Sequence, residues 1–214
     1  MLIGIPIYDG VNVLDVTGPY EVLSWAGFDV QLFAQKPGLV ACRGGISIQA
    51  TGAFKQAPPF DVLWVPGGDP DALARESGDP KRTYLDFLIR QSVHARYVAS
   101  VCEGAMLLAA AGLLDGYEAT THWAFIPCLT ERFRKVKVVD GHPRYCLDRN
   151  RLTGGGVSSG LDEALELVQL LMGTGKAQYV QQSIQYYPRP PVTSEIPPAK
   201  SCPMPPVVIP PPRK

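Results

Sequence analysis

The sequence predicts an α/β fold with a mostly parallel sheet and helices on both of its faces. Short apolar stretches rich in β-branched residues alternate with stretches that repeat their apolar residues at helical spacing. Several of the apolar stretches end in Gly or in a polar side chain, and parallel sheets bind their ligands beyond the carboxyl ends of strands. The chain has 214 residues, of which 46% are hydrophobic, and this suits one domain with a sizeable core.

The first half of the chain supplies three strands, a hairpin and two helices. Pro6 predicts an edge position or an early kink for the first strand. Thr17 is a candidate cap for the first helix, Pro19 suits its first turn, and Gly27 ends it. The expected elements are strands at 2–8, 28–33 and 60–65, a hairpin of 39–42 with 46–50, and helices at 17–26 and from Asp79-Pro80 to about 93.

A strand-to-helix turn at Cys102 is the feature around which the chain is organised. Residues 97–101 have the pattern of a buried strand, and residues 103–111 that of a helix that is apolar all round. Nothing separates the two, and Gly104 and Ala105 keep the bend uncrowded. Such an elbow exposes one side chain at the end of a sheet. A thiol there faces the free N–H groups and the dipole at the helix N-terminus, which lower its pKa and make it a nucleophile.

The competing interpretation of Cys102 is a buried, inert side chain. Cys is among the most buried residue types and usually behaves as a small hydrophobe. The elbow and the small residues that follow it favour the nucleophile.

The second half of the chain continues the alternation of strands and helices. His122 begins a helical stretch, and its leading interpretation is a cap or a packing residue. The turn Asp140-Gly141 separates two of the strands. The expected elements are strands at 117–121, 136–139, 145–147 and 151–153 and helices at about 161–172 and 176–185.

Asp15, Gly67-Gly68 and Cys102 each follow a predicted strand, so they can converge at one edge of the sheet. Asp15 has two interpretations, a capping carboxylate and a functional acid. The two glycines leave backbone N–H groups open to a ligand, although a simple turn is equally typical of such a pair.

Composition excludes several classes of protein. Lys plus Arg equals Asp plus Glu at 20 each, and nucleic acid is therefore a poor candidate partner. The sequence has neither an apolar run of membrane-spanning length nor a charged N-terminal region, so we expect a cytoplasmic protein. The five cysteines form no CxxC pair and the three histidines match no metal spacing, so we expect no disulfide framework, no metal and no cofactor.

Six segments together resemble the ThiJ/PfpI family of the class I glutamine amidotransferase-like superfamily. The resemblance covers nearly all of residues 1–192, and within the family the pattern is most similar to the isonitrile hydratases. It implies a flavodoxin-like sandwich, a homodimer and a reactive Cys at Cys102. The segments are LDVTGP at 14–19, VPGG at 65–68, SVCEGA at 100–105, ATTHW at 119–123, LTGGG at 152–156 and YYPRPP at 186–191.

Glu103 departs from the pattern of the family. The PfpI-type peptidases have His after the nucleophilic Cys, and isonitrile hydratases typically have Thr, so the peptidase pair is missing here. We expect the Glu103 carboxylate to turn away from Cys102, toward an Arg or a backbone donor, and to leave the thiol partly ionised near neutral pH. A carboxylate over the thiol would instead raise the thiol pKa.

The leading functional hypothesis is a lyase of the hydro-lyase type that adds water to an isonitrile, a small-molecule substrate, and forms an N-substituted formamide. Cys102 is the expected nucleophile and Asp15 the expected acid. Two alternatives are a glyoxalase-like activity on reactive aldehydes and a non-catalytic or redox-sensing module. The residues expected to bind substrate or stabilise an oxyanion are Gly67, Gly68, Glu103, Gly104, Thr121 and His122.

The C-terminal tail, residues 188–214, follows an α/β domain at 1–187. Eleven of the last 28 residues are Pro, which is typical of an extended chain without internal hydrogen bonds. We expect its segment from Ile196 to Lys214 to lie across a partner subunit or over its own domain.

Overall fold

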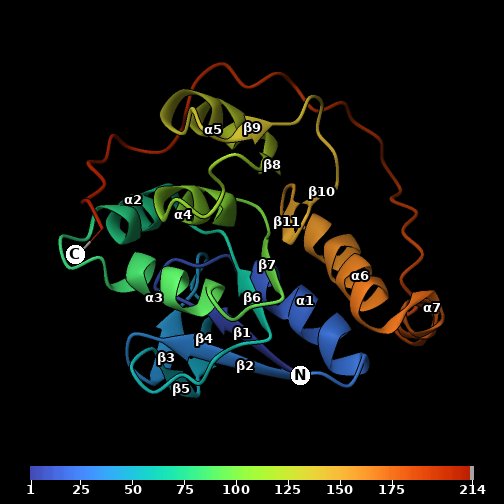
Figure 1. Cartoon of the computed structure of the whole chain (residues 1–214). Helices are drawn as coiled ribbons and strands as arrows, with labels where there is room; N and C mark the ends of the chain where they lie inside the picture. The colour runs from blue at the N-terminus through green and yellow to red at the C-terminus, as the bar shows by residue number, and fades with distance from the viewer. Residues whose placement is uncertain (213–214) are drawn as a thin grey trace.

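The computed structural model describes residues 1–212, and its centre is a seven-stranded sheet (Figure 1). The strand order is β10-β11-β7-β6-β1-β2-β5, and only the pair β10 and β11 is antiparallel within this sheet. The predicted α/β fold is confirmed. The strands are β1 (Leu2–Pro6), β2 (Asp29–Ala34), β5 (Gly52–Ala53), β6 (Val62–Val65), β7 (Tyr97–Ser100), β10 (Tyr145–Asp148) and β11 (Arg151–Gly154).

Helices cover both faces of the sheet (Figure 1). One face carries α1 (Val13–Trp25), α6 (Ser159–Met172) and α7 (Thr174–Ser183), which contact one another. The other carries α2 (Pro70–Gly78), α3 (Thr83–Ser92) and α4 (Gly104–Ala110), with α5 (Ile126–Arg132) beside α4. Every residue of β6 is buried, as a strand covered on both faces requires. None of the described helices is both long and apolar enough to cross a membrane.

Two further pairs of strands among the described residues lie outside the main sheet. The predicted hairpin is present as β3 (Gly38–Ala41) and β4 (Ser47–Ala50). The strands on either side of Asp140-Gly141 do not pair with each other. Instead β9 (Lys137–Val138) runs parallel to β8 (Glu118–Ala119), and β10 pairs with β11.

Several local predictions were wrong for the N-terminal half. Pro19 lies inside helix α1, beyond its first turn, because the helix begins earlier than the sequence predicts. β1 lies between β2 and β6, and Pro6 is only its last residue, so the missing N–H does not force the strand to the edge. Helix α1 begins at Val13 after Asn12, so Thr17 is not its cap; the Thr17 hydroxyl donates to the carbonyl of Val13 at 2.9 Å.

The helix expected from Asp79-Pro80 begins instead at Thr83. Asp79 accepts hydrogen bonds from the N–H groups of Lys81 and Thr83 at 2.9 and 3.0 Å and so shapes the turn before the helix. Helix α2 was not predicted, although Asp69-Pro70 carries the Pro that suits a first helical position.

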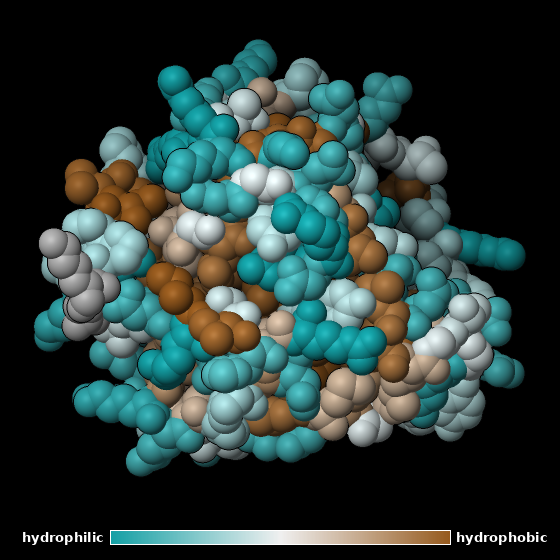
Figure 2. Space-filling model, in the orientation of Figure 1, coloured by the Kyte–Doolittle hydropathy of each residue, from teal (hydrophilic) through white to brown (hydrophobic). Residues whose placement is uncertain are grey.

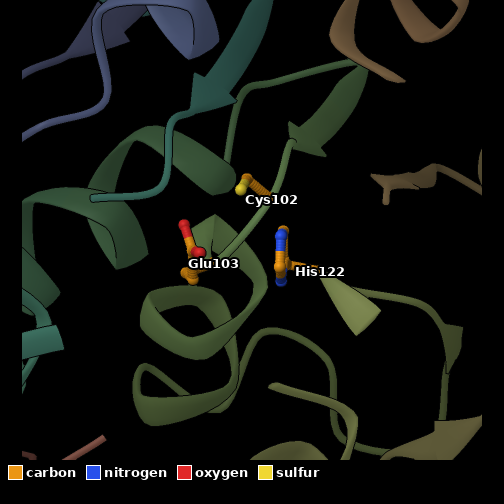
Figure 3. A group of neighbouring side chains, drawn as sticks. All are labelled: Cys102, Glu103 and His122. Carbon is orange, nitrogen blue, oxygen red and sulfur yellow. The ribbon is translucent and has the colours of Figure 1, made fainter. Parts of the chain in front are cut away.

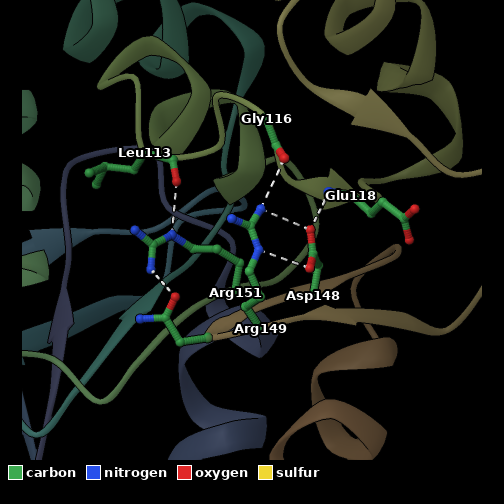
Figure 4. A network of polar contacts seen from close by, with 7 residues as sticks. Leu113, Gly116, Glu118, Asp148, Arg149 and Arg151 are labelled. Carbon is green, nitrogen blue, oxygen red and sulfur yellow. Dashed lines mark hydrogen bonds and ion pairs between the residues drawn. The ribbon is translucent and has the colours of Figure 1, made fainter.

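A polar network holds the start of β11 (Figure 4). The buried Arg151 donates to the carbonyl of Leu113 at 2.8 Å. Its neighbour Arg149 donates to the carbonyl of Gly116 at 2.9 Å and lies over the Tyr117 ring, 3.6 Å from its centroid. These contacts fix the turn between β10 and β11, and with it the strand that leads to residues 154–157.

The Pro-rich tail lies over its own domain and crosses one side of the molecule from α7 to α2 (Figure 1). Met204 is buried, and Arg132 donates to the carbonyls of Met204 and Pro205 at 2.5 and 2.9 Å. Arg82 donates to the carbonyl of Pro210. The part of the predicted segment at 213–214 lies outside the described residues. On the face that Figure 2 shows, hydrophobic residues form separate patches among hydrophilic ones.

A disulfide joins Cys128 in α5 to Cys202 in the tail, and this corrects the expectation of no disulfide. The two cysteines are 74 residues apart in the sequence. Their spacing therefore carries no signal, and only the path of the tail over α5 brings them together.

Candidate active site

The carboxyl ends of three adjacent strands meet at one edge of the sheet. Asp15 stands in the first turn of α1 after β1, Gly67 follows β6, and Cys102 follows β7. From β1 the chain continues to β2 on one side of it, and β6 and β7 later add on the other side. This edge is therefore a topological switch point, where such sheets usually bind their ligands.

The elbow at Cys102 has the strained backbone that the sequence predicts. Cys102 has φ of 56°, which is the left-handed region that L side chains rarely adopt. A Cβ on Gly104 would lie 2.1 Å from the carbonyl oxygen of Val65, so only Gly fits after the bend. The N–H of Cys102 donates to the carbonyl of Gly155 at 2.8 Å, and the Thr121 hydroxyl donates to the Cys102 carbonyl at 2.8 Å. The elbow is therefore held from two other segments.

Asp15 is fully buried and keeps a proton at neutral pH. Its Oδ2 accepts hydrogen bonds from the N–H of Gly67 at 3.0 Å and from the Asn12 amide at 3.3 Å. Burial raises the pKa of Asp15 to about 8 and the negative charge of Glu103 adds to the rise, against the opposing effect of these hydrogen bonds. Its Oδ1 is buried with no hydrogen-bond partner among the described residues. A protonated carboxyl group whose second oxygen has no hydrogen-bond partner among the described residues can give a proton to a bound substrate.

The Glu103 carboxylate lies over the thiol, which corrects the expectation that it turns away. Glu103 is buried, and its Oε2 accepts a hydrogen bond from the Asn12 amide at 3.0 Å. A Cβ on Gly67 would lie 2.4 Å from that oxygen and 2.9 Å from Asp15 Oδ2, so Gly67 makes room for two carboxyl groups side by side. Within residues 1–212 the donor to this carboxylate is the amide of Asn12 and not an Arg.

The thiol of Cys102 is neutral at rest, which corrects the expectation of a partly ionised thiol. Burial raises the pKa of Cys102 well above its usual value, and the charges of Asp15 and Glu103 and a hydrogen bond to Glu103 raise it further. A hydrogen bond from the N–H of Val157 acts in the opposite direction. The helix after the elbow is short, residues 104–110, so its dipole does not offset the two carboxyl groups.

His122 is the third side chain at the thiol (Figure 3). The ligand atoms of Cys102, Glu103 and His122 all lie within 4.8 Å of one another. The sequence predicts a cap or a packing residue at His122, and its Nδ1 accepts a hydrogen bond from the N–H of Ala124 at 3.2 Å. That bond assigns the proton of the neutral ring to Nε2. Burial lowers the pKa of His122, which favours the neutral ring.

These three side chains are also the types that bind zinc. A metal needs an unprotonated ring nitrogen, whereas Nδ1 is occupied by the Ala124 N–H and Nε2 carries the proton. Metal binding here would therefore have to break the cap of the helical turn at 123–125.

Two of the backbone N–H groups that were expected to bind a ligand already donate hydrogen bonds to other groups of the protein. The N–H of Gly67 donates to Asp15, and that of Gly104 donates to the carbonyl of Val101 at 3.0 Å. Gly68 stands in an isolated bridge with Val11. Gly67 thus holds the carboxyl group of Asp15, and Gly104 holds the end of the strand before Cys102.

A cavity of about 360 Å³ opens beside this cluster. His122 and Gly155 line it and also belong to the elbow's surroundings, and Ile196 of the tail forms part of its wall. Its other lining residues are Thr121, Trp123, His142, Pro143, Arg144, Gly156, Val157, Ser158 and Ser159.

Sequence reasoning missed Asn12, Val157 and Glu163. Asn12 precedes α1 by one residue, and the signal that could have found it is a polar side chain between Val11 and Val13 at the end of a strand. Glu163 is fully buried, and both its carboxyl oxygens are without a hydrogen-bond partner in the described part of the chain. Glu163 lies near the N-terminus of α6, where an acid suits the helix dipole, and α6 packs against α1.

Comparisons with known proteins identify the family of the chain. The model of the DJ-1/PfpI family matches residues 1–170. An isonitrile hydratase of Pseudomonas putida is 41% identical over 197 residues, which are 91% of this chain and 82% of that protein. An HTH-type transcriptional regulator of Pseudomonas aeruginosa is 32% identical over 58% of this chain and 32% of the regulator.

Solved structures show the same fold. A ThiJ/PfpI family protein from Pseudomonas syringae superposes with a TM-score of 0.81 at 33% identity and covers 89% of this chain and 77% of that one. Drosophila melanogaster DJ-1beta has a TM-score of 0.74 at 22% identity, with 86% of this chain and 97% of that chain covered. The elbow cysteine, the strand order and these matches together show that the chain belongs to the DJ-1/PfpI family.

Proposed function

We propose that the protein adds water to an isonitrile and releases an N-substituted formamide. The observation that carries the proposal is that the Asp15 carboxyl and the Cys102 thiol share the amide of Asn12, 3.3 Å from Asp15 Oδ2 and 3.7 Å from Cys102 Sγ, in a chain 41% identical to an isonitrile hydratase. Burial raises the pKa of Asp15 to about 8. The terminal carbon of an isonitrile must gain both a bond to a nucleophile and a proton. A thiol and a neutral carboxyl at one site supply these two groups.

In the first step the Cys102 sulfur bonds to the terminal carbon. The thiol proton passes to the Glu103 carboxylate, and the Asp15 proton goes to the same carbon. The product is a thioimidate, S–CH=N–R, and Asp15 is left as a carboxylate. The hydrogen bond from the Val157 N–H favours the sulfur as its negative charge develops.

In the second step water adds to the thioimidate carbon. Asp15 takes one water proton and Glu103 gives its proton to the nitrogen. The carbon–sulfur bond then breaks, the carbonyl forms, and the hydroxyl proton returns to sulfur. The formamide leaves, and Cys102, Asp15 and Glu103 regain their starting protonation states.

Glu103 thus acts as the general base that accepts the thiol proton, as an adjacent base does in other sites with a nucleophilic thiol. The resting thiol pKa is raised, so a neighbouring acceptor is needed for ionisation during attack. The same raised pKa disfavours the redox-sensing alternative, because peroxide oxidises the thiolate.

The test is turnover of a panel of alkyl and aryl isonitriles, with formamide followed by ultraviolet absorbance after treatment of the protein with a chelator. We expect turnover by the wild type and none by Cys102→Ala. Absence of turnover across the panel, with methylglyoxal converted to D-lactate instead, would replace the hydratase by the aldehyde activity. A homodimer and a cytoplasmic location stay predictions from the sequence.

A further inference from the structure

The tail forms one wall of the cavity beside the thiol. Ile196 lines the cavity together with His122 and Trp123, and its side chain is 49% exposed. His122 in turn lies within 4.8 Å of the Cys102 and Glu103 ligand atoms. The cavity therefore lies between Ile196 of the tail and the His122 ring, which is next to the thiol.

The segment that carries Ile196 is fixed at both of its ends. On its N-terminal side the Tyr186 hydroxyl donates to Asp162 at 3.3 Å, at the start of α6. On its C-terminal side the disulfide joins Cys202 to Cys128, six residues beyond Ile196. Cys128 belongs to α5, which continues directly from the turn at 123–125 that His122 caps. The disulfide thus ties the segment to the element that positions His122.

An extended Pro-rich chain has few internal hydrogen bonds and depends on outside contacts for its position. After Cys202, Met204 is buried, and Arg132 donates hydrogen bonds to the carbonyls of Met204 and Pro205. These contacts hold residues 204 and 205 in place. The disulfide at Cys202 holds the part of the tail that precedes them, which runs toward the cavity.

We propose that residues 187–202 form a strap over the mouth of the substrate cavity, that Ile196 selects the N-substituent of the isonitrile, and that the Cys128–Cys202 disulfide holds the strap closed. This rests on the proposed function for the identity of the substrate. The substituent it fits is a compact apolar group, because Ile196, Trp123, Pro143 and Val157 supply apolar wall.

Opening the strap needs a dithiol reductant. The sulfur–sulfur bond breaks, Cys128 and Cys202 each gain a proton and one electron, and the dithiol is oxidised to its cyclic disulfide. Cys102 takes no part in this exchange.

The first experiment compares Ile196→Ala with Val192→Ala on methyl and cyclohexyl isonitrile, both with the disulfide intact. Val192 belongs to the same strap and is 75% exposed, but it does not line the cavity. We expect Ile196→Ala to change the cyclohexyl-to-methyl ratio of kcat/KM by about tenfold, mainly through KM, and Val192→Ala to leave it unchanged. An unchanged ratio in Ile196→Ala overturns the role of Ile196.

The second experiment does not depend on isonitrile turnover. Alkylation of the Cys102 peptide by iodoacetamide and by N-phenylmaleimide is followed by mass spectrometry in the wild type and in Cys128→Ser/Cys202→Ser. We expect the bulky maleimide to react at least about fivefold faster in the variant, with a smaller change for iodoacetamide.

Equal acceleration of both reagents, or no acceleration, overturns the strap. A failure of isonitrile turnover together with selective maleimide acceleration would overturn the proposed function and leave the strap in place. Brief reduction of the wild type, followed by removal of the dithiol, should reproduce the variant's labelling.

Discussion

The side-chain amide of Asn12 donates a hydrogen bond to Glu103 Oε2 at 3.0 Å, across the gap between the ends of β1 and β7. The same nitrogen lies 3.3 Å from Asp15 Oδ2 and 3.7 Å from Cys102 Sγ. One amide has two donor hydrogens, so it is shared among three acceptors that would otherwise repel one another when charged. Asn12 is therefore the positioning residue of the site.

Replacing Asn12 by Ala should lower kcat by about 10- to 100-fold, because both carboxyl groups lose a donor. The variant should also raise the pKa of Asp15, since the Asn12 hydrogen bond lowers it, and so move the alkaline limb of the pH–rate profile upward. Asn150→Ala makes the same chemical change beside Arg151, away from the site, and should alter neither quantity. A lower kcat with an unmoved alkaline limb would contradict the positioning role.

The pH–rate profile should fall as the pH rises through about 8, because Asp15 acts in its protonated form and has a pKa of about 8. Asp15→Asn keeps the shape of the side chain but has no acidic proton, and we expect a loss of turnover of at least about 100-fold with no alkaline limb left. Steady-state rates between pH 5 and 9.5 measure this. A rate that rises through pH 8 would instead indicate that the thiolate, not the carboxylic acid, limits the reaction.

The thermal stability of the folded protein should depend on pH through the carboxyl group of Asp15. The folded pKa of Asp15 lies above its usual 3.8, so the folded protein binds the proton more tightly than the unfolded chain does. Its contribution to stability is full below about 3.8 and is lost as the pH rises through about 8. Asp15→Asn should therefore show a Tm advantage over the wild type that grows from pH 4 to pH 8. A constant difference in Tm over that range would show that Asp15 is ionised in the folded protein.

Glu103→Gln should lower the pKa of Cys102, since it removes a neighbouring negative charge. Turnover should nevertheless fall, because the acceptor of the thiol proton is lost. Thiolate absorbance, with the Cys102→Ala titration subtracted, measures the pKa, and Glu166→Gln, beside Tyr145, is the control. A lower thiol pKa with faster turnover would show that Glu103 suppresses the reaction.

Gly104→Ala should destabilise the protein by about 3 kcal/mol or prevent folding, because its Cβ would meet the backbone oxygen of Val65 at 2.1 Å. Gly175→Ala is the matched control in α7: a Cβ there meets no atom within 4 Å, and we expect a stabilisation of about 0.5–1 kcal/mol. Urea unfolding of both variants measures the difference. Similar free energies of unfolding for the two would contradict the packing at the elbow.

Most of the strands, the turn at Cys102 and the edge of the sheet where the site lies could be predicted from local patterns in the sequence. The apolar run of 97–101, the small residues after Cys102 and the Gly pair at 67–68 are local patterns, and the residue types within each short window indicate the structure. Asp15 and Cys102 could be placed together because parallel strands bring their carboxyl ends to one edge.

Only the tertiary structure decided the charge state of the site. The direction of the Glu103 side chain depends on Asn12, which is 91 residues away in the sequence, and the pKa values of Asp15 and Cys102 depend on burial. The Cys128–Cys202 disulfide and the position of Ile196 likewise depend on the path of the tail over α5. Contacts of this kind join residues far apart in the sequence, so no local period or spacing predicts them. They form only when packing brings the distant segments together.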